Sequence, residues 1–150
     1  MITCINHIGL STADLDKALH FYCGLMGLEL ILDQPFGNGS IDTITALEDA
    51  RGRVALVKLG NTELEIFEFS NPPAKVNDPK RPVCDHGITH ICFEVTNIQQ
   101  EYERLRASGV NFHCEPQDAG SVKAVYGRDP DGNVFELLEI IDNGTTHSGE

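Results

Sequence analysis

The sequence predicts an α+β fold made of two β-α-β-β-β modules. Three observations support this: the two halves begin alike, each opening leads into a capped amphipathic helix, and short strands separated by turns follow each helix. The first half opens with His7-Ile-Gly-Leu-Ser and the second with His90-Ile-Cys-Phe-Glu. Self-similarity at one offset is typical of a duplicated structural unit. We therefore expect a single domain over residues 1–150, built of repeats 5–69 and 88–141.

A helix is expected directly after the first strand of each half. Asp14 and Asn97 stand seven positions after their histidines, and such side chains accept hydrogen bonds from the free N–H groups at a helix start. Apolar residues follow at helical spacing, namely Leu15, Leu19 and Tyr22 in one half and Ile98, Tyr102 and Leu105 in the other. Glycines at positions 24 or 27 and at 109 are suited to the left-handed ends of these helices.

Short strands and turns complete each half. The expected strands are 28–33, 41–47, 54–59 and 63–69 in the first half, and 111–114, 122–128 and 134–141 in the second. Asp129-Pro-Asp-Gly-Asn133 forms the turn before the last strand. Residues 70–87 contain four prolines without periodicity and are expected to be a linker, and the small, polar residues 143–150 a flexible tail.

Composition and charge exclude several classes of partner. Eleven basic and 23 acidic residues give a net charge of −12, which repels nucleic acids and anionic membrane surfaces. No apolar segment approaches the roughly 18 residues that span a bilayer, and we expect a cytoplasmic protein that binds a small molecule. The five cysteines form no CxxC pair, so free thiols are expected. Cys92 is interpreted as a small hydrophobe rather than a soft metal ligand.

Two histidines and two glutamates are the candidate metal ligands. A lone histidine in a strand is more often structural, but His7 and His90 occupy the same place in each repeat. The last strand of each repeat carries an inward glutamate, Glu65 or Glu136, beside apolar side chains. Burying such a carboxylate is costly unless it is protonated, paired or bound to a cation. Two imidazoles and two carboxylates suit one divalent ion of Zn, Ni, Co, Mn or Fe.

Other polar residues carry weaker expectations. Glu68 and Glu139 point to the opposite face of their strands and are expected to be ordinary surface or interface residues. Four histidines have no counterpart in the other repeat and are expected to be solvated, with His86 a candidate for a pocket mouth: His20, His86, His113 and His147. Three cations are candidates for binding a substrate carboxylate or phosphate, although solvated charge is the simpler interpretation: Arg51, Arg53 and Lys123.

Four segments resemble the vicinal oxygen chelate superfamily, which includes glyoxalase I, bleomycin resistance proteins and extradiol dioxygenases. They are His7-Ile-Gly-Leu, Lys17-Ala-Leu-His-Phe-Tyr22 leading to Gly27-Leu-Glu-Leu, Gly87-Ile-Thr-His-Ile-Cys-Phe-Glu-Val95, and Asp129-Pro-Asp-Gly-Asn-Val-Phe-Glu136. The resemblance implies a glyoxalase-like fold, in which the modules form an open barrel-like sheet around one metal ion. It also implies a substrate that chelates the metal through two neighbouring oxygens, and a homodimer.

The resemblance leaves the reaction open. Glyoxalase I and the epimerases fill all four ligand positions, so Glu65 favours a metal-dependent lyase or isomerase acting on a small α-hydroxy or α-keto carbonyl compound through a metal-stabilised enolate. Glu136 or Glu65 is the expected catalytic base. Ala55-Leu-Val-Lys-Leu-Gly60 resembles methylmalonyl-CoA epimerase, but Val54 stands where that enzyme carries a catalytic glutamate.

Two alternatives belong to other functional classes. An Fe(II) extradiol dioxygenase would use His7, His90 and Glu136 as a facial triad. An antibiotic-resistance thiol transferase would also use three ligands, whereas a drug-binding protein of this superfamily usually lacks metal ligands. Glu65 would be a fourth ligand, which the dioxygenases and the transferases do not use. The presence of metal ligands counts against a protein that only binds a drug.

Overall fold

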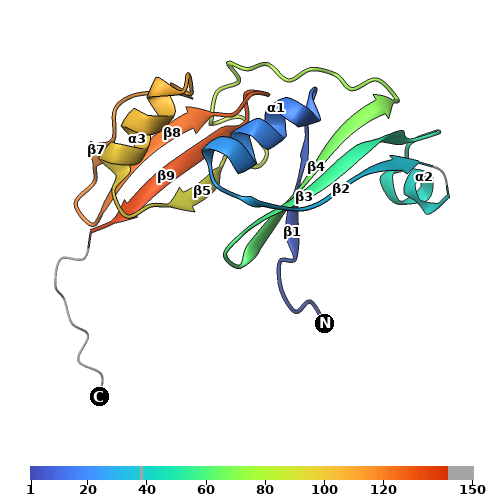
Figure 1. Cartoon of the computed structure of the whole chain (residues 1–150), viewed down its shortest axis with the longest axis horizontal. Coiled ribbons are helices and arrows are strands. Elements are labelled where there is room, and N and C mark those ends of the chain that lie inside the picture. Colours follow the sequence, from blue (N-terminus) through green and yellow to red (C-terminus); the bar gives the residue numbers. More distant parts are fainter. Residues whose placement is uncertain (38, 142–150) are drawn as a thin grey trace. The chain divides into compact units, whose positions relative to one another are not determined.

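The computed structural model describes residues 1–37 and 39–141. The chain forms two compact units, Met1–Asn77 and Asp78–Glu150, and the boundary falls within the segment 70–87 (Figure 1). The predicted flexible tail, residues 143–150 with His147, lies outside the described residues. In the part of the chain that the structure describes, no helix is long and apolar enough to cross a membrane.

The first unit is a four-stranded sheet with one long helical segment. In chain order its elements are β1 (His7–Ser11), α1 (Leu15–Leu19), the π-helix η1 (His20–Leu25), β2 (Glu29–Gly37), α2 (Ser40–Thr45), β3 (Arg51–Leu59) and β4 (Thr62–Asn71). The strand order is β1-β4-β3-β2. β1 runs parallel to β4, and the other pairs are antiparallel.

The second unit repeats this plan. Its elements are β5 (Ile91–Glu94), α3 (Ile98–Ala107), β6 (Asn111–Phe112), β7 (Gln117–Asp118), β8 (Val122–Arg128) and β9 (Val134–Ile140). The strand order is β5-β9-β8-β6, and β7 also pairs with β8. In both units the opening strand is parallel to the last strand, which confirms the predicted α+β fold of two related modules.

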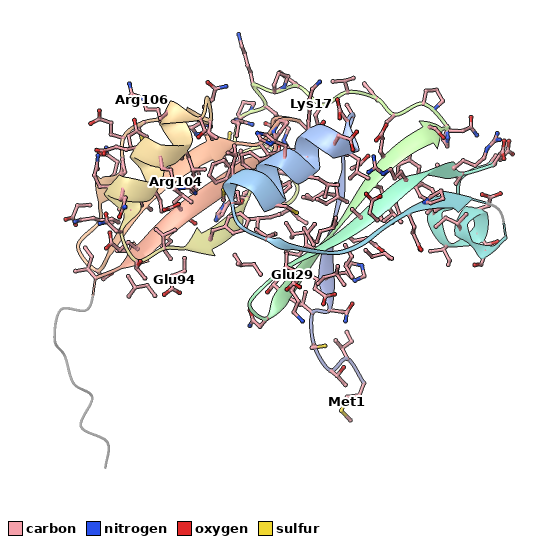
Figure 2. All side chains as sticks on the ribbon, in the orientation of Figure 1. Met1, Lys17, Glu29, Glu94, Arg104 and Arg106 are labelled. Atoms are coloured by element: carbon pink, nitrogen blue, oxygen red, sulfur yellow. The ribbon has the colours of Figure 1, made fainter. Side chains whose placement is uncertain are left out.

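Both predicted helix starts are confirmed. Oδ1 of Asp14 accepts a hydrogen bond from the N–H of Lys17 at 3.0 Å, and Oδ1 of Asn97 accepts one from the N–H of Gln100 at 3.1 Å. Charged side chains on these helices, such as Lys17 and Arg104 (labelled in Figure 2), are exposed. The helical segments are followed by glycines 27 and 109 with positive φ values of 80° and 87°, as left-handed helix ends require.

Glu68 and Glu139 are not ordinary surface residues, so the prediction for them is wrong. Oε2 of Glu68 accepts a hydrogen bond from the N–H of Leu15 at 3.0 Å, and Oε2 of Glu139 accepts one from the N–H of Ile98 at 3.2 Å. Each carboxylate satisfies a free backbone donor in the first turn of its helix, where the helix dipole also favours negative charge. The last strand of each unit is thereby tied to the helix of the same unit.

The core of each unit lies between its helix and one face of its sheet. Fully buried side chains in the first unit include Leu15, Val57 and Ile66, and in the second Ile98, Leu105 and Leu137. Because successive residues of a strand point to opposite faces, Glu65 and Glu136 project from the other face of each sheet. Both candidate glutamates are therefore accessible for binding rather than packed in the helix-covered core.

The predicted strand 41–47 is wrong, since α2 occupies these residues. Oγ1 of Thr45 donates a hydrogen bond to the carbonyl oxygen of Ile41 at 2.7 Å, and the carboxylate of Asp42 accepts bonds from the N–H groups of Asp49 and Ala50. Strands β2 and β3 are longer than predicted and pair directly with each other. β2 is the edge strand of this sheet, because it pairs with β3 alone.

The second unit differs from the prediction in its short strands. β6 covers only two residues of the predicted strand 111–114, and β7 is a two-residue strand that the pattern did not predict. Both pair with β8, which has its predicted bounds. These brief pairings carry too few residues to produce an alternating apolar pattern.

Candidate metal centre

The first unit brings His7 and Glu65 into contact. β1 and β4 place Gly9 opposite Glu65, and Nε2 of His7 lies 3.3 Å from Oε2 of Glu65. The side chains of this pair are 41% and 33% exposed. A Cβ atom at Gly9 would have no neighbour within 4 Å, so open space adjoins the strand beside the carboxylate.

The second unit brings His90 and Glu136 into the same contact. His90 directly precedes β5, and its Nε2 lies 3.0 Å from Oε2 of Glu136. The side chains of this pair are 26% and 14% exposed, so it is more enclosed than the first pair. In the described residues no group of three or more histidine, cysteine, aspartate or glutamate side chains has metal-binding geometry, and each unit supplies one His–Glu pair.

The other ring nitrogen of each histidine also has an oxygen partner. Nδ1 of His7 lies 2.9 Å from Oδ1 of Asn6, and Nδ1 of His90 lies 2.9 Å from Oγ1 of Thr89. The amide oxygen of Asn6 can only accept, so it favours the His7 tautomer with its proton on Nδ1 and a lone pair on Nε2, whereas the hydroxyl of Thr89 can donate to His90 or accept from it. Nε2 then faces a carboxylate oxygen as a second electron-pair donor, an arrangement that a cation between the two atoms would stabilise. The donor set therefore fits a divalent metal.

Tyr126 is a site residue that the sequence reasoning missed. It lies opposite Glu136 in the pairing of β8 with β9, and its ring centroid is 4.8 Å from that of His90. Burial raises the pKa of the Tyr126 hydroxyl, and the charges of Glu136 and Cys92 raise it further. Tyr126 lies on the strand before the one that carries Glu136, which is a signal the sequence does contain. The register between the two strands, however, cannot be derived from the pattern of either strand alone.

His113 is exposed, but it is not simply solvated as predicted. Its Nε2 accepts a hydrogen bond from Nε of Arg128 at 3.1 Å, and its ring lies edge-on to Tyr126 at 6.2 Å. Burial and the neighbouring guanidinium of Arg128 lower the pKa of His113. The neutral imidazole is therefore the form that accepts this bond. His20 and His86 are exposed, as predicted.

Cys92 lies opposite Glu136 on the neighbouring strand. Partial burial, a hydrogen bond with Glu136 and the charges of Glu136 and Glu94 raise the pKa of its thiol to about 12. The group is thus protonated at neutral pH, whereas metal ligation requires the thiolate. Its role as a small hydrophobe rather than a ligand stays a prediction, and all five cysteines are free thiols.

The predicted substrate-binding cations have other roles in the structure. Arg53 donates hydrogen bonds to both carboxylate oxygens of Asp33, at 2.7 and 2.6 Å, and to Asp16 at 2.7 Å. Arg51 pairs with Asp49. Lys123 lies opposite Glu139, the carboxylate at the start of α3. The contacts of Arg51 and Arg53 favour the simpler interpretation, in which these two cations serve the fold.

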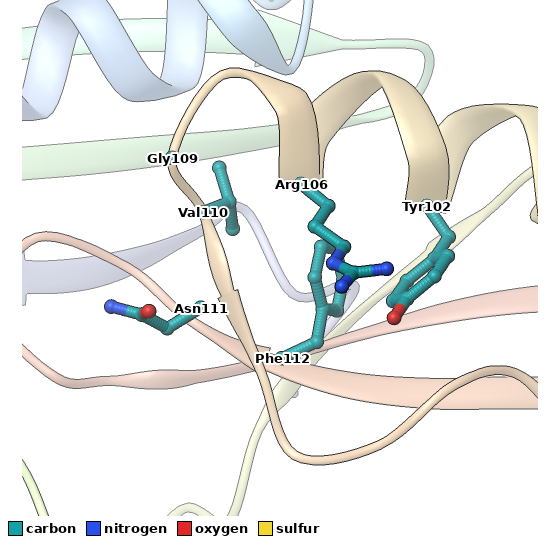
Figure 3. Close-up of a pocket in the computed structure, with 6 residues that line it drawn as sticks. All are labelled: Tyr102, Arg106, Gly109, Val110, Asn111 and Phe112. Atoms are coloured by element: carbon teal, nitrogen blue, oxygen red, sulfur yellow. The ribbon is translucent and has the colours of Figure 1, made fainter.

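A pocket of about 270 Å³ lies at the end of α3 (Figure 3). Its lining consists of Tyr102, Arg106, Gly109, Val110, Asn111 and Phe112. The guanidinium carbon of Arg106 lies 5.9 Å from the centroid of the Tyr102 ring, a cation–π contact within one helix. None of the four predicted metal ligands lines this pocket.

Three curated relatives with named activities cover most of this chain. A 2-epi-5-epi-valiolone epimerase from Actinomyces sp is 28% identical over 91% of this chain and 79% of its own length. Metallothiol transferase FosB from Staphylococcus epidermidis is 28% identical over 91% of this chain and 81% of its own length. A lactoylglutathione lyase from Pseudomonas aeruginosa is 26% identical over 96% of this chain and 86% of its own length.

A solved structure shares the fold of this chain, and a sequence profile shows its family. The crystal structure of a glyoxalase family protein from Bacillus cereus matches with a TM-score of 0.86 and 22% identity, covering 94% of this chain and 96% of that chain. The profile of the glyoxalase superfamily matches residues 4–137. The chain therefore belongs to the Glyoxalase/Bleomycin resistance protein/Dioxygenase superfamily.

Proposed function

We propose that the protein is a metal-dependent lyase or isomerase of the glyoxalase I or epimerase type, acting on a small α-hydroxy or α-keto carbonyl compound. The observation that carries this proposal is the contact between a histidine Nε2 and a glutamate Oε2 in both repeats, at 3.3 and 3.0 Å. Relatives named as an epimerase and a lactoylglutathione lyase support the reaction class.

The proposed cofactor is one divalent metal ion, of Zn, Ni, Co, Mn or Fe, with His7, Glu65, His90 and Glu136 as its ligands. Two imidazole nitrogens and two carboxylate oxygens form a donor set that these metals accept. When bound, the ion would polarise a substrate carbonyl and stabilise negative charge on its oxygen.

The proposed catalytic bases are the two ligand glutamates. Proton transfer next to a carbonyl needs a carboxylate within reach of the C–H bond. Glu136 is held by the thiol of Cys92 and is only 14% exposed in its side chain. Glu65 is more exposed, and open space adjoins Gly9 beside it. We therefore favour Glu65 as the group that takes the proton and Glu136 as the more fixed ligand.

Val54 argues against the specific chemistry of methylmalonyl-CoA epimerase. It is buried and lies opposite Phe67 in the pairing of β3 with β4. A valine side chain holds no titratable proton, so proton transfer in this protein has to use another group. On the sheet face of the first unit, Glu63 is paired with Lys58, whereas Glu65 contacts the candidate ligand His7.

A thiol transferase is the second candidate, because the relative FosB carries that name. By resemblance such enzymes use three ligands, and so do the extradiol dioxygenases. In this chain the fourth position is a glutamate in contact with His7. That contact favours the four-ligand lyase or isomerase over both three-ligand classes.

We also propose that the protein is a cytoplasmic homodimer with a small-molecule substrate. Three successive apolar residues of the edge strand β2 are exposed, namely Leu30, Ile31 and Leu32. An exposed apolar edge strand is a common site of association between chains. Sedimentation equilibrium of the purified protein would give twice the chain mass if this proposal holds, and a monomer at micromolar concentration would contradict it.

The reaction class can be tested with three substrates on metal-loaded protein. We expect turnover of a hemithioacetal of glutathione or of a racemic acyl-CoA ester, and no oxygen uptake with catechol. Oxygen uptake with catechol and Fe(II) would instead assign the dioxygenase class. Transfer of a thiol to fosfomycin without turnover of the first two substrates would assign the transferase class.

A further inference from the structure

Three aromatic rings gather on the sheet face that carries Glu65. Phe36 on β2 lies edge-on to Phe67 and Phe69 on β4, with centroid distances of 5.4 and 5.2 Å. Phe67 and Phe69 are stacked at 5.5 Å with an interplanar angle of 21°. We call these three residues the aromatic cluster. All three are only partly buried, so their rings are available for contact.

The backbone places the aromatic cluster next to the candidate metal ligand. Phe67 and Phe69 stand two and four positions after Glu65, on the same face of β4. Phe36 reaches this face across Gly52, where a Cβ atom would lie 2.9 Å from the Phe36 ring and 1.9 Å from a backbone oxygen of Glu68. A side chain at position 52 would collide with both, so glycine there allows the ring to cover the sheet.

The residues between the cluster and the ligand are also apolar. Val54 lies opposite Phe67, and Leu56 lies opposite Glu65. Gln34, opposite Val54, and Ser11, opposite Phe67, are the polar side chains that flank this hydrocarbon surface.

In the described helices and strands of the first unit, no lysine or arginine is left without a carboxylate partner to bind an anionic group of a substrate. Each described cation of its helices and strands already has a carboxylate partner: Lys17 with Asp14, Arg51 with Asp49, Arg53 with Asp16 and Asp33, and Lys58 with Glu63. A phosphate or carboxylate group held here would lose its hydration without gaining a counter-charge. The charge distribution therefore favours a neutral, apolar group.

We propose that the aromatic cluster binds an aryl group of the substrate, next to the two neighbouring oxygens that the metal site would hold. The inference rests on the proposed function for its metal-binding half, and it names the substrate class as an aryl-substituted α-hydroxy or α-keto carbonyl compound. Aromatic rings pack favourably edge-on or offset against other rings, which is the geometry the cluster presents.

The test uses two chelators that differ only in their substituent. Benzohydroxamate and acetohydroxamate both bind a metal through two neighbouring oxygens, but one carries a phenyl ring and the other a methyl group. With zinc-loaded protein, calorimetry should show benzohydroxamate binding tighter by about tenfold or more. Phe67→Leu, which keeps the apolar volume, and Phe67→Ala should reduce this preference at least about threefold without changing acetohydroxamate affinity.

Ile44→Ala is the matched control, because Ile44 is an exposed apolar residue of α2 outside the aromatic cluster. It should leave both affinities unchanged. Equal affinities of the two hydroxamates for the unmodified protein would overturn the proposal, as would a phenyl preference that survives both Phe67 variants. If Phe67→Ala instead changes the oligomeric state and leaves the phenyl preference intact, that result would assign the cluster to contact with a second copy of the chain. It would also overturn the proposal.

A second experiment, which needs no metal, tests the aryl site separately from the proposed function. The ¹⁹F NMR line of 4-fluorobenzohydroxamate should broaden with protein kept in EDTA, and the broadening should be lost in Phe67→Ala. If no metal binds, the proposed function fails, but the NMR experiment in EDTA still shows whether the aromatic cluster binds an aryl group. Absence of broadening with the unmodified protein, or broadening unchanged by Phe67→Ala, would overturn the aryl site.

Discussion

Nε2 of His90 and Oε2 of Glu136 are 3.0 Å apart, and the ring of Tyr126 lies against the imidazole at 4.8 Å. The contact joins the residue before β5 to the middle of β9, so it depends on the parallel pairing of these strands. The aromatic ring limits the orientations that the imidazole can adopt. Metal affinity should therefore respond to the packing at position 126 as well as to the ligands themselves.

Tyr126→Ala should weaken metal binding by about 10- to 100-fold, the usual effect of removing a group that orients a ligand. Tyr126→Phe keeps the ring against His90 and should retain the affinity. Competition with a chromophoric chelator measures both variants. Equal losses in Tyr126→Ala and Tyr126→Phe would show that the hydroxyl, rather than ring packing, is the important group.

Glu65→Ala should lower metal affinity by at least about 100-fold and abolish lyase or isomerase activity, because it removes both a ligand and the proposed base. Glu63→Ala is the control, since this neighbouring carboxylate pairs with Lys58. Metal titration and steady-state assays measure the two effects. Full metal content and activity in Glu65→Ala would turn the assignment toward the three-ligand transferases and dioxygenases.

Glu68→Gln and Glu139→Gln should each lower the free energy of unfolding by about 1 kcal/mol, since each weakens a bond to a first-turn N–H. Because the two bonds involve different helices, the losses should add in the double variant. Urea unfolding measures the change. Stability unaffected by either substitution would mean that these carboxylates do not hold the helices in solution.

Asp33→Asn should reduce stability at neutral pH, with an effect that disappears in acid. The hydrogen bonds from Arg53 lower the pKa of Asp33 below its ordinary value of 3.8. Its ionised form therefore stabilises the folded chain above pH 3.8, and this contribution is lost as the pH falls through the lowered pKa. Unfolding free energies of the two proteins should converge below pH 4 and differ at pH 7.

Asp85→Asn, an exposed aspartate of the segment 70–87, is the control for this pH series and should follow the unmodified protein throughout. A difference between the unmodified protein and Asp33→Asn that stays constant from pH 7 to pH 3 would contradict the proposed role of the Arg53 contact. The test depends only on how the difference in unfolding free energy between the two proteins changes with pH, not on the absolute value for either protein.

Those features that local chemistry decides could be predicted from the sequence. Asp14 and Asn97 cap helices because their side chains reach the nearby N–H groups whatever the rest of the chain does. The repeated histidines and last-strand glutamates were predicted as pairs, and His7 does contact Glu65 as His90 contacts Glu136. Metal ligation by the four residues stays a prediction.

The features that were missed depend on contacts between distant segments. α2 forms where Asp42 bonds to the N–H groups of Asp49 and Ala50, which overrides the strand-like pattern of 41–47. Tyr126 joins the site through cross-strand register, and Glu68 through a bond to the N–H of Leu15, 53 positions away. No periodicity within a single element encodes these partners.

Metal stoichiometry tests the four-residue site most directly. Elemental analysis after dialysis against trace divalent metals should find one ion per chain in the unmodified protein, and a large loss in both His7→Ala and His90→Ala. Starting from one ion per chain, near-complete loss in both variants is the result expected when the two pairs share that ion. Two ions per chain with each substitution removing one, or no copurifying or rebinding transition metal, would contradict the site.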